Sequence, residues 1–200
     1  AITAAVGASA GVGSAAAVGA STAAVAGDAA GWALDGSTIT ATATGWGNSG
    51  SYSDQSIAGD GYVEATIGAT TTYAFLGLST ANPDAGFAGI EFALYTYVDT
   101  NFLYVYEKNG SQFAVGSASY VIGDVIRVER SGTTVTYRKN GSLIYTSLLS
   151  SSGALHVDTA LLGSGSKIYN VHLRDAGADV AITWSHVGAT STPTGIGAAT

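Results

Sequence analysis

The sequence has 200 residues, of which 46% are hydrophobic and only 10% are charged, with 28 Gly, 2 Pro, no Cys and no Met. Seven basic against fourteen acidic residues give a net charge of −7, so we expect no nucleic acid partner, because a phosphate backbone requires clustered Lys and Arg. The absence of cysteine excludes disulfides, thiolate metal sites and cysteine nucleophiles. Since no run of 18 apolar residues occurs outside the small-residue N-terminus, we also expect no membrane insertion.

The first segment, residues 1–30, contains 14 Ala and 5 Gly and no aromatic side chain. Val-Gly recurs there at Val6, Val12 and Val18, and a related Gly/Ala/Thr-rich composition returns over residues 185–200. Such a segment is either a flexible linker or an assembled fibrous shaft through which copies of the chain associate. We favour the shaft, because small side chains become ordered only by close packing against a partner. The chain itself is expected to be a fragment or a processed product.

The central segment, residues 31–184, predicts an all-β domain of about ten short strands separated by turn residues. We therefore expect one antiparallel two-sheet sandwich or barrel, with Val180–Trp184 closing an edge. The predicted strands are Ser37–Ala43, Gly61–Ile67, Tyr73–Ser79, Gly89–Val98, Phe102–Glu107, Asp124–Arg130, Thr133–Lys139, Ser142–Leu148, Leu155–Leu162 and Lys167–Arg174.

One pair of hairpins predicts a core face. The pair Asn140-Gly141 suits a two-residue type I′ turn that opposes Tyr137 to Ile144 and Thr136 to Tyr145. A turn at Ser131-Gly132 then opposes Val128 to Val135 and Ile126 to Tyr137. The predicted core side chains are Ile126, Val128, Val135, Tyr137 and Ile144, and the opposite row holds Arg127, Thr136 and Tyr145.

The hairpin from Gly89 to Lys108 predicts a candidate binding site. A turn at Asp99-Thr100 opposes Tyr95 to Tyr104, Tyr97 to Phe102, Ala93 to Tyr106 and Glu91 to Lys108. Four tyrosines then share one partly exposed face, and the opposite face pairs Leu94 with Val105 and Thr96 with Leu103. A tyrosine ring with its polar tip can stack on a sugar ring, although tyrosine is also common in strands for packing reasons alone. The candidate glycan platform is Tyr95, Tyr97, Tyr104, Tyr106 and Trp46.

The stretch from Trp32 to Leu173 resembles the concanavalin A-like lectin/glucanase superfamily, in the form found in phage tail fibres and bacterial surface adhesins. The resemblance lies in an ordered series of short motifs over about 140 of the 200 residues. These motifs are Gly45–Gly50, Gly59–Glu64, Gly77–Ser79, Gly123–Arg130, Val135–Gly141 and Ile168–Leu173. The resemblance implies a two-sheet jelly roll with a tendency to bind glycans, displayed extracellularly or on a virion surface.

Catalytic patterns are lacking. Glucanases of this superfamily carry Glu-x-Asp-x-x-Glu on one strand, and no Glu here is followed at the second position by Asp, so we expect no enzyme activity. His156, His172 and His186 are scattered, which disfavours zinc. No cofactor is expected; calcium, held by loop residues among Asp54, Asp60, Asn82 and Asp84, is kept as an alternative although their spacing fits no standard loop.

Charge is unevenly distributed along the chain. Residues 1–107 hold nine acidic and no basic residues, and residues 108–200 hold seven basic and five acidic ones. Acidic and basic surfaces would either meet between copies or be interleaved within one sandwich.

The sequence favours a non-enzymatic structural and adhesive protein of a phage fibre or extracellular filament, with a jelly roll displayed for cell-surface glycans. Two alternatives stay open: a decoration or spacer domain without a ligand, and a glycoside hydrolase with non-standard carboxylates.

Overall fold

The computed structural model describes residues 37–108 and 111–193. The Gly/Ala-rich segment over residues 1–30 and the end of the second repeat, residues 194–200, lie outside the described residues. The described part is an all-β sandwich of two antiparallel sheets with one short 3₁₀ turn, η1 (Phe87–Gly89), as the sequence predicts. Within it, no helix has the length and apolarity needed to cross a membrane.

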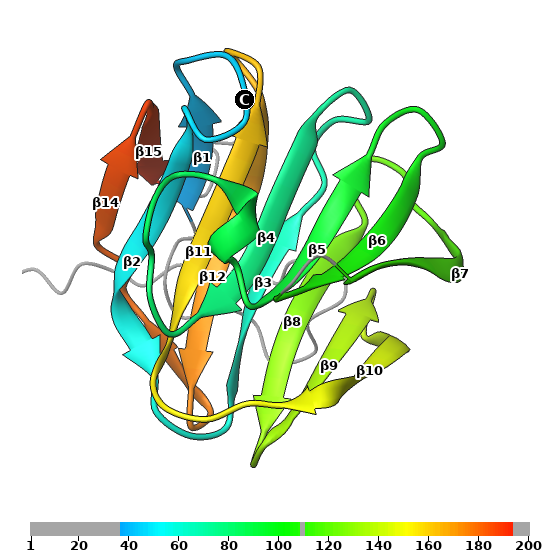
Figure 1. Ribbon diagram of the computed structural model, residues 1–200, viewed down its shortest axis with the longest axis vertical. Helices are drawn as coiled ribbons and strands as arrows, with labels where there is room; N and C mark the ends of the chain where they lie inside the picture. The colour runs from blue at the N-terminus through cyan, green and yellow to red at the C-terminus, as the bar shows by residue number, and fades with distance from the viewer. Residues whose placement is uncertain (1–36, 109–110, 194–200) are drawn as a thin grey trace, which may run out of the picture.

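Sheet I has eight strands and sheet II has seven (Figure 1). In spatial order, sheet I consists of β10 (Ser142–Ser150), β9 (Thr134–Lys139), β8 (Val125–Ser131), β3 (Gly61–Thr66), β12 (Lys167–Asp175), β1 (Ser37–Ala41) and β15 (Ala189–Pro193), with β13 (Ala178–Val180) paired to β12. Sheet II consists of β14 (Trp184–Val187), β2 (Gly50–Ile57), β11 (Leu155–Leu162), β4 (Tyr73–Ser79), β5 (Phe92–Tyr97), β6 (Phe102–Glu107) and β7 (Ser111–Ser119).

The main core fills the space between the sheets. Alternate side chains of each strand point inward, so that Leu94, Leu103 and Val105 of sheet II meet Val128 and Tyr137 of sheet I, all of them buried. Burial of each large aliphatic side chain contributes about 1.5–3 kcal/mol. The remaining predicted core residues, Ile126, Val135 and Ile144, belong to the same cluster, Ile144 being half-buried.

A buried hydrogen bond between side chains crosses this core and joins the two sheets. Glu107 of β6 is only 2% exposed, and its Oε1 accepts a hydrogen bond of 3.0 Å from the hydroxyl of Tyr137 on β9. A buried carboxyl group is costly without a partner, so the pair holds the two sheets in one relative position. Burial also raises the pKa of Tyr137, which keeps its hydroxyl protonated as a donor.

The two sheet I turns differ from the expected ones in register. Asn140 and Gly141 have φ of 49° and 77°, as a type I′ turn requires, and Lys139 pairs with Ser142. A bulge after Leu143 then opposes Tyr145, rather than Ile144, to Tyr137, so the predicted Tyr137–Ile144 and Thr136–Tyr145 pairs are wrong.

The preceding hairpin is displaced by two residues. Ser131 pairs with Thr134, which opposes Val128 to Tyr137 and Arg130 to Val135 instead of the expected pairs. Because the side-chain period of a strand is two, the same residues still face the core.

Besides β13, four strands lie where none was expected. Gly50–Ile57 and Ser111–Ser119 form β2 and β7, and the chain beyond residue 184 forms β14 and β15, which pair with β2 and β1. The sandwich therefore extends to Pro193, past the expected boundary at residue 184. The apolar piece Val180–Trp184 spans the end of β13 and the start of β14, and β14 forms one edge of sheet II.

Candidate functional site

The hairpin β5–β6 has the predicted register. Tyr95 opposes Tyr104, Tyr97 opposes Phe102 and Ala93 opposes Tyr106. Glu91 lies beside Lys108, with an ion pair of 3.0 Å. The four tyrosines of β5 and β6 consequently point away from sheet I, onto the outer face of sheet II, and the aliphatic residues point into the core.

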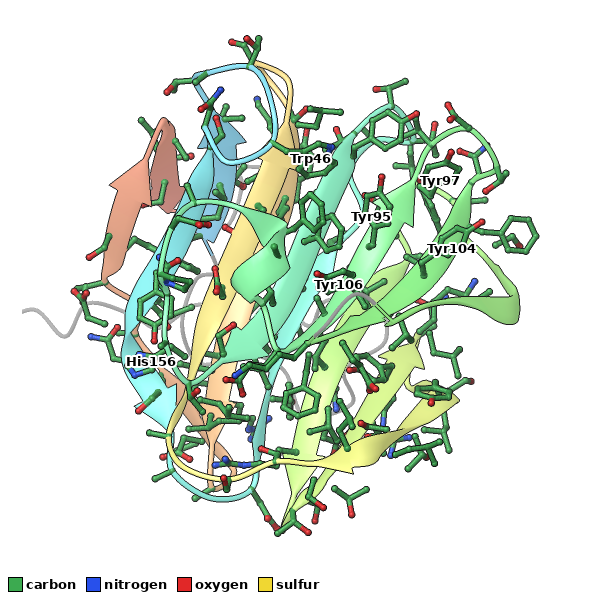
Figure 2. All side chains as sticks on the ribbon, in the orientation of Figure 1. Trp46, Tyr95, Tyr97, Tyr104, Tyr106 and His156 are labelled. Carbon is green, nitrogen blue, oxygen red and sulfur yellow. The ribbon has the colours of Figure 1, made fainter. Side chains whose placement is uncertain are left out.

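This outer face carries a second apolar cluster, separate from the core between the sheets. Figure 2 places Trp46 and the four tyrosines together over β4, β5 and β6, with His156 well apart from them. The buried members of the cluster are Phe75, Ile90, Ala93, Tyr95, Tyr106 and Ala160, and the half-buried residues packed against them are Trp46, Tyr73, Phe87, Tyr97 and Tyr104.

Two of the predicted platform tyrosines are buried, contrary to expectation. Tyr95 is 8% exposed and Tyr106 is 4% exposed. Tyr95 stacks on Phe75 with ring centroids 4.2 Å apart, and Phe75 stacks in turn on Phe87, at 4.8 Å. Phe87 belongs to η1 in the connection between β4 and β5, which runs across the outer face of sheet II (Figure 1). Tyr95 and Tyr106 therefore pack beneath the half-buried rings and are not free to stack on a ligand.

Trp46 packs against this connection as well. Its ring meets Phe87 edge-on at 5.1 Å and Phe75 at 5.3 Å, and it approaches Tyr95 to 6.0 Å. Gly47 has φ of 84°, and a single bridge joins it to Ala85 in the connection. Trp46 is half-buried, so it acts as one wall of the cluster and keeps part of its surface exposed.

Glycine on β4 lets the connection sit directly on the sheet. Gly77 points to the outer face, and a Cβ there would lie 2.6 Å from Cγ2 of Ile90 and 2.5 Å from the carbonyl oxygen of Phe92. Only a residue without a side chain fits at this spacing. The connection can therefore lie this close to β4 only because Gly77 has no side chain.

The exposed layer consists of Tyr73, Tyr97 and Tyr104, which we call the tyrosine platform. Tyr97 lies between the other two, with ring centroids 5.7 Å from Tyr73 and 5.3 Å from Tyr104, both edge-on. All three are half-buried, with Tyr95 beneath at 5.7 to 6.3 Å. Edge-on packing holds rings at fixed angles, so the platform is preorganised.

Asp99 completes this end of the face. It lies exposed in the β5–β6 turn, and its Oδ1 accepts a hydrogen bond of 2.6 Å from the hydroxyl of Tyr73. The hydroxyl of Tyr97 also donates to Asp99, and these bonds raise the pKa of both tyrosines, that of Tyr73 to about 12. Sequence reasoning missed Tyr73 and Asp99 as site residues, although the turn that it placed at Asp99-Thr100 put Asp99 at the end of the tyrosine rows.

The opposite end of the outer face is polar. Tyr52 of β2 stacks on His156 of β11, with ring centroids 4.7 Å apart, and the Nδ1 of His156 lies 2.8 Å from the carbonyl oxygen of Ser53. Next to them Asp158 is 2% exposed and is hydrogen-bonded by the side chain of Ser79. Burial raises the pKa of Asp158 to about 7 and, with the charge of Asp158, also raises the pKa of Tyr52.

The loop residues considered for calcium serve other roles. Asp60 accepts hydrogen bonds from the backbone N–H of Gly132 and from Ser131, Asp84 from the N–H of Gly86, and Asp54 from Thr183 and Ser185. Within residues 37–108 and 111–193, no three His, Cys, Asp or Glu side chains are grouped to hold a metal ion.

The outer face of sheet I carries several ion pairs. Glu64 pairs with Arg127, with Oε2 and Nε 2.6 Å apart, and Glu129 pairs with Arg138 at 2.6 Å. The guanidinium of Arg127 also covers the ring of Tyr62 at 3.7 Å. The Glu64–Arg127 pair joins an acidic residue of the first half of the chain to a basic residue of the second half, whereas Glu129 and Arg138 both belong to the second half. The four glutamates of the described residues are all engaged, since Glu91 pairs with Lys108 and Glu107 with Tyr137.

Comparison with known proteins bears on the fold. The chain matches a native heptameric SAP-like pentraxin from Limulus polyphemus with a TM-score of 0.51 and 11% identity, over 80% of this chain and 95% of the pentraxin. This likeness shows the fold, an antiparallel two-sheet jelly-roll sandwich.

Weaker structural matches are two alginate lyases. The lyase AlgAT5 from polysaccharide lyase family 7 gives a TM-score of 0.30 and 12% identity over 78% of this chain and 59% of the lyase. The lyase from Klebsiella pneumoniae gives 0.23 and 12% over 80% of this chain and 60% of the lyase. No protein-family model and no curated protein matches the sequence. A likeness in fold does not by itself assign an activity.

Proposed function

We propose that this chain is a non-enzymatic adhesive protein that displays a carbohydrate-binding jelly roll on a phage fibre or another extracellular filament. The observation that carries the proposal is the tyrosine platform, in which Tyr73, Tyr97 and Tyr104 present fixed, half-exposed rings beside the carboxylate of Asp99. Aromatic rings bind the apolar faces of sugars, and a carboxylate accepts hydrogen bonds from their hydroxyl groups.

The construction beneath the platform supports binding. A buried second layer of Tyr95, Phe75 and Tyr106 fixes the strands that carry the exposed rings. Rings that are already ordered lose little conformational freedom when a ligand stacks on them. Packing alone would not call for a half-exposed layer of tyrosines, one of which, Tyr73, donates its hydroxyl to an exposed carboxylate.

The filament part of the proposal rests on the sequence. Residues 1–30 are an Ala/Gly/Ser array that we expect to associate with copies of itself. The platform would then be repeated along an assembly, and several weak sites acting together bind a glycan-coated surface far more tightly than one site does.

The test is a glycan array followed by calorimetry with the glycan that binds best. Tyr104→Ala and Tyr97→Ala should each weaken binding at least tenfold, which corresponds to about 1.4 kcal/mol, while the protein stays folded. The control is Tyr62→Ala, which removes a half-buried tyrosine from the outer face of sheet I and should leave the affinity unchanged. Equal losses in all three variants would contradict the proposal.

The same assays separate the alternatives. A spacer domain would bind no glycan on the array. A hydrolase would release reducing sugar, and its candidate carboxylates on the outer face of sheet II are Glu91 and Asp158. Neither is free, because Glu91 is bonded to Lys108 and Thr80, and Asp158 is buried, at 2% exposed. The geometry therefore favours binding over cleavage.

A further inference from the structure

The carboxylate of Asp99 is held in place as an acceptor. The phenolic hydroxyl of Tyr73 donates to its Oδ1 at 2.6 Å, and the carboxylate raises the pKa of both Tyr73 and Tyr97. An ionised carboxylate has about four acceptor positions. Because Asp99 is exposed, its remaining acceptor positions face solvent at the edge of the tyrosine platform.

Within the described residues, no strand of sheet II carries a Lys or Arg side chain. All seven Lys and Arg of the sequence lie within the described residues, and six of them are on sheet I strands. These six are Arg127 and Arg130 on β8, Arg138 and Lys139 on β9, and Lys167 and Arg174 on β12. The seventh, Lys108, follows β6 at the opposite end of its hairpin and is paired with Glu91 at 3.0 Å.

The rest of the outer face of sheet II adds negative charge. Asp84 lies in the β4–β5 connection, exposed to solvent, and Asp54 is exposed on β2. An acidic sugar is usually recognised by Arg or Lys through charge-assisted hydrogen bonds. At the tyrosine platform its carboxylate would instead meet the carboxylate of Asp99, and like charges that are juxtaposed repel.

We propose that the tyrosine platform selects sugars that offer hydrogen-bond donors, either hydroxyl or ammonium groups, and rejects glycans that carry carboxylates. This inference rests on the proposed function and adds the class of ligand to it. Asp99 is the residue that sets the selection: it accepts from two vicinal hydroxyl groups of a neutral sugar, or from the ammonium group of an amino sugar, and it repels a uronic acid.

The experiment uses the full chain and matched pairs of oligosaccharides, each neutral glycan being compared with the same glycan oxidised at C6 to the uronic acid. A partly deacetylated chitin oligomer and its fully acetylated form serve as the amino and neutral pair. We expect the best neutral ligand to bind at least tenfold more tightly than its oxidised counterpart. Binding of the neutral ligand should be insensitive to salt, and deacetylation should not weaken binding.

The variant Asp99→Asn keeps an acceptor for Tyr73 and removes the charge. It should weaken neutral-glycan binding, because an amide accepts fewer hydrogen bonds than a carboxylate, and it should reduce the ratio of neutral to oxidised affinity at least fivefold. The matched control Asp54→Asn removes one exposed acidic charge from β2, away from the platform, and should leave the ratio of the two affinities unchanged.

The outcomes separate this inference from the function on which it rests. Equal or tighter binding of the oxidised glycan, or the same change of ratio in Asp54→Asn, overturns the selection by Asp99 but leaves glycan binding intact. Absence of binding to every member of the panel overturns both.

Discussion

Tyr95 and Leu94 are neighbours on β5 that point to opposite faces of sheet II. Both are buried, with exposed fractions of 8% for Tyr95 and 0% for Leu94. We predict that Tyr95→Ala destabilises the protein by about 3–5 kcal/mol, comparable with about 2–5 kcal/mol for Leu94→Ala, because each leaves a cavity in a packed cluster. Urea unfolding measures both. Tyr104→Ala, at a half-buried ring, should cost clearly less.

This prediction replaces the one that the sequence alone supports, in which Tyr95 is exposed and contributes to binding rather than to stability. A loss below about 1 kcal/mol for Tyr95→Ala would show that the β4–β5 connection does not cover the ring in solution. Tyr95 would then be counted among the platform residues.

Gly141 is required by the turn between β9 and β10. Its φ is 77°, and nothing lies within 4 Å of a Cβ placed there, so the cost of a side chain is backbone strain alone. Gly141→Val should destabilise the protein by roughly 1–2 kcal/mol. The control is Gly59→Val, at a position that is equally open and has no positive φ; its melting temperature should change little. A melting temperature within error for Gly141→Val would argue against the type I′ turn.

At the level of elements, strand pairs joined by short turns were predictable and long connections were not. The β5–β6 pairing was predicted residue for residue because the turn residues and the alternation of tyrosine with aliphatic side chains agree. The Ser131 turn was predicted two residues out of register, without consequence for the faces. The bulge after Leu143 changed the pairing of Tyr145, and no residue near it marks an extra position.

The strand β2 escaped prediction because its inward side chains are serines. Ser51 and Ser53 are buried, and they exchange hydrogen bonds with β11: the N–H of Ser51 donates to Oγ1 of Thr159 at 2.9 Å, and the N–H of Val157 donates to Oγ of Ser53 at 2.8 Å. A prediction based on alternating apolar and polar residues does not detect such a strand. These two bonds join residues more than a hundred positions apart, although Oγ of Ser53 also donates to the nearby carbonyl oxygen of Gln55 at 2.6 Å.

The candidate site depends on the same kind of distant contact. Sequence placed four tyrosines on one face, but the connection that buries Tyr95 and Tyr106 is fixed by the Gly47–Ala85 bridge and by the fit of Ile90 onto Gly77. Neither contact leaves a periodic signal in the sequence. The division into exposed and buried rings therefore required the structure.

The polar end of the outer face predicts a pH dependence of stability. Burial raises the pKa of Asp158 from 3.8 to about 7, so between these values the folded chain holds a proton that the unfolded chain has lost. The free energy of unfolding should therefore fall as the pH rises from about 4 to about 7, by on the order of 4 kcal/mol from this group, and change no further above that range.

The measurement is urea unfolding at several pH values for the wild type and for Asp158→Asn, which keeps the size of the side chain and cannot ionise. The difference in unfolding free energy between the two proteins should change in favour of the variant as the pH rises through this window. A difference that is independent of pH would mean that Asp158 is ionised in the folded protein at all these values.

For the whole molecule, the two outer faces have opposite characters. Sheet I presents ion pairs in which acidic and basic side chains neutralise each other. Sheet II presents aromatic rings and acidic residues. The candidate platform lies on sheet II, and the charges on the outer face of sheet I are paired. This arrangement fits a domain that binds its ligand through one face only.

Assembly is a prediction about the Gly/Ala-rich segment. Deletion of residues 1–30 should convert an oligomer into a monomeric jelly roll, because we expect the small side chains to pack only against other copies. Light scattering of the full and shortened chains measures the mass, and glycan affinity per chain on an unclustered ligand should stay the same. An unchanged mass per particle would remove the proposed shaft.

The most direct test of the glycan-binding surface is an NMR titration of protein labelled on its tyrosine rings, using the best glycan from the array. We predict saturable chemical-shift changes for the ring signals of Tyr73, Tyr97 and Tyr104. The changes should be smaller for Tyr95 beneath them and absent for Tyr62 and Tyr137. Saturable shifts centred on Tyr62, or glycan binding that leaves the platform rings unmoved, would contradict it.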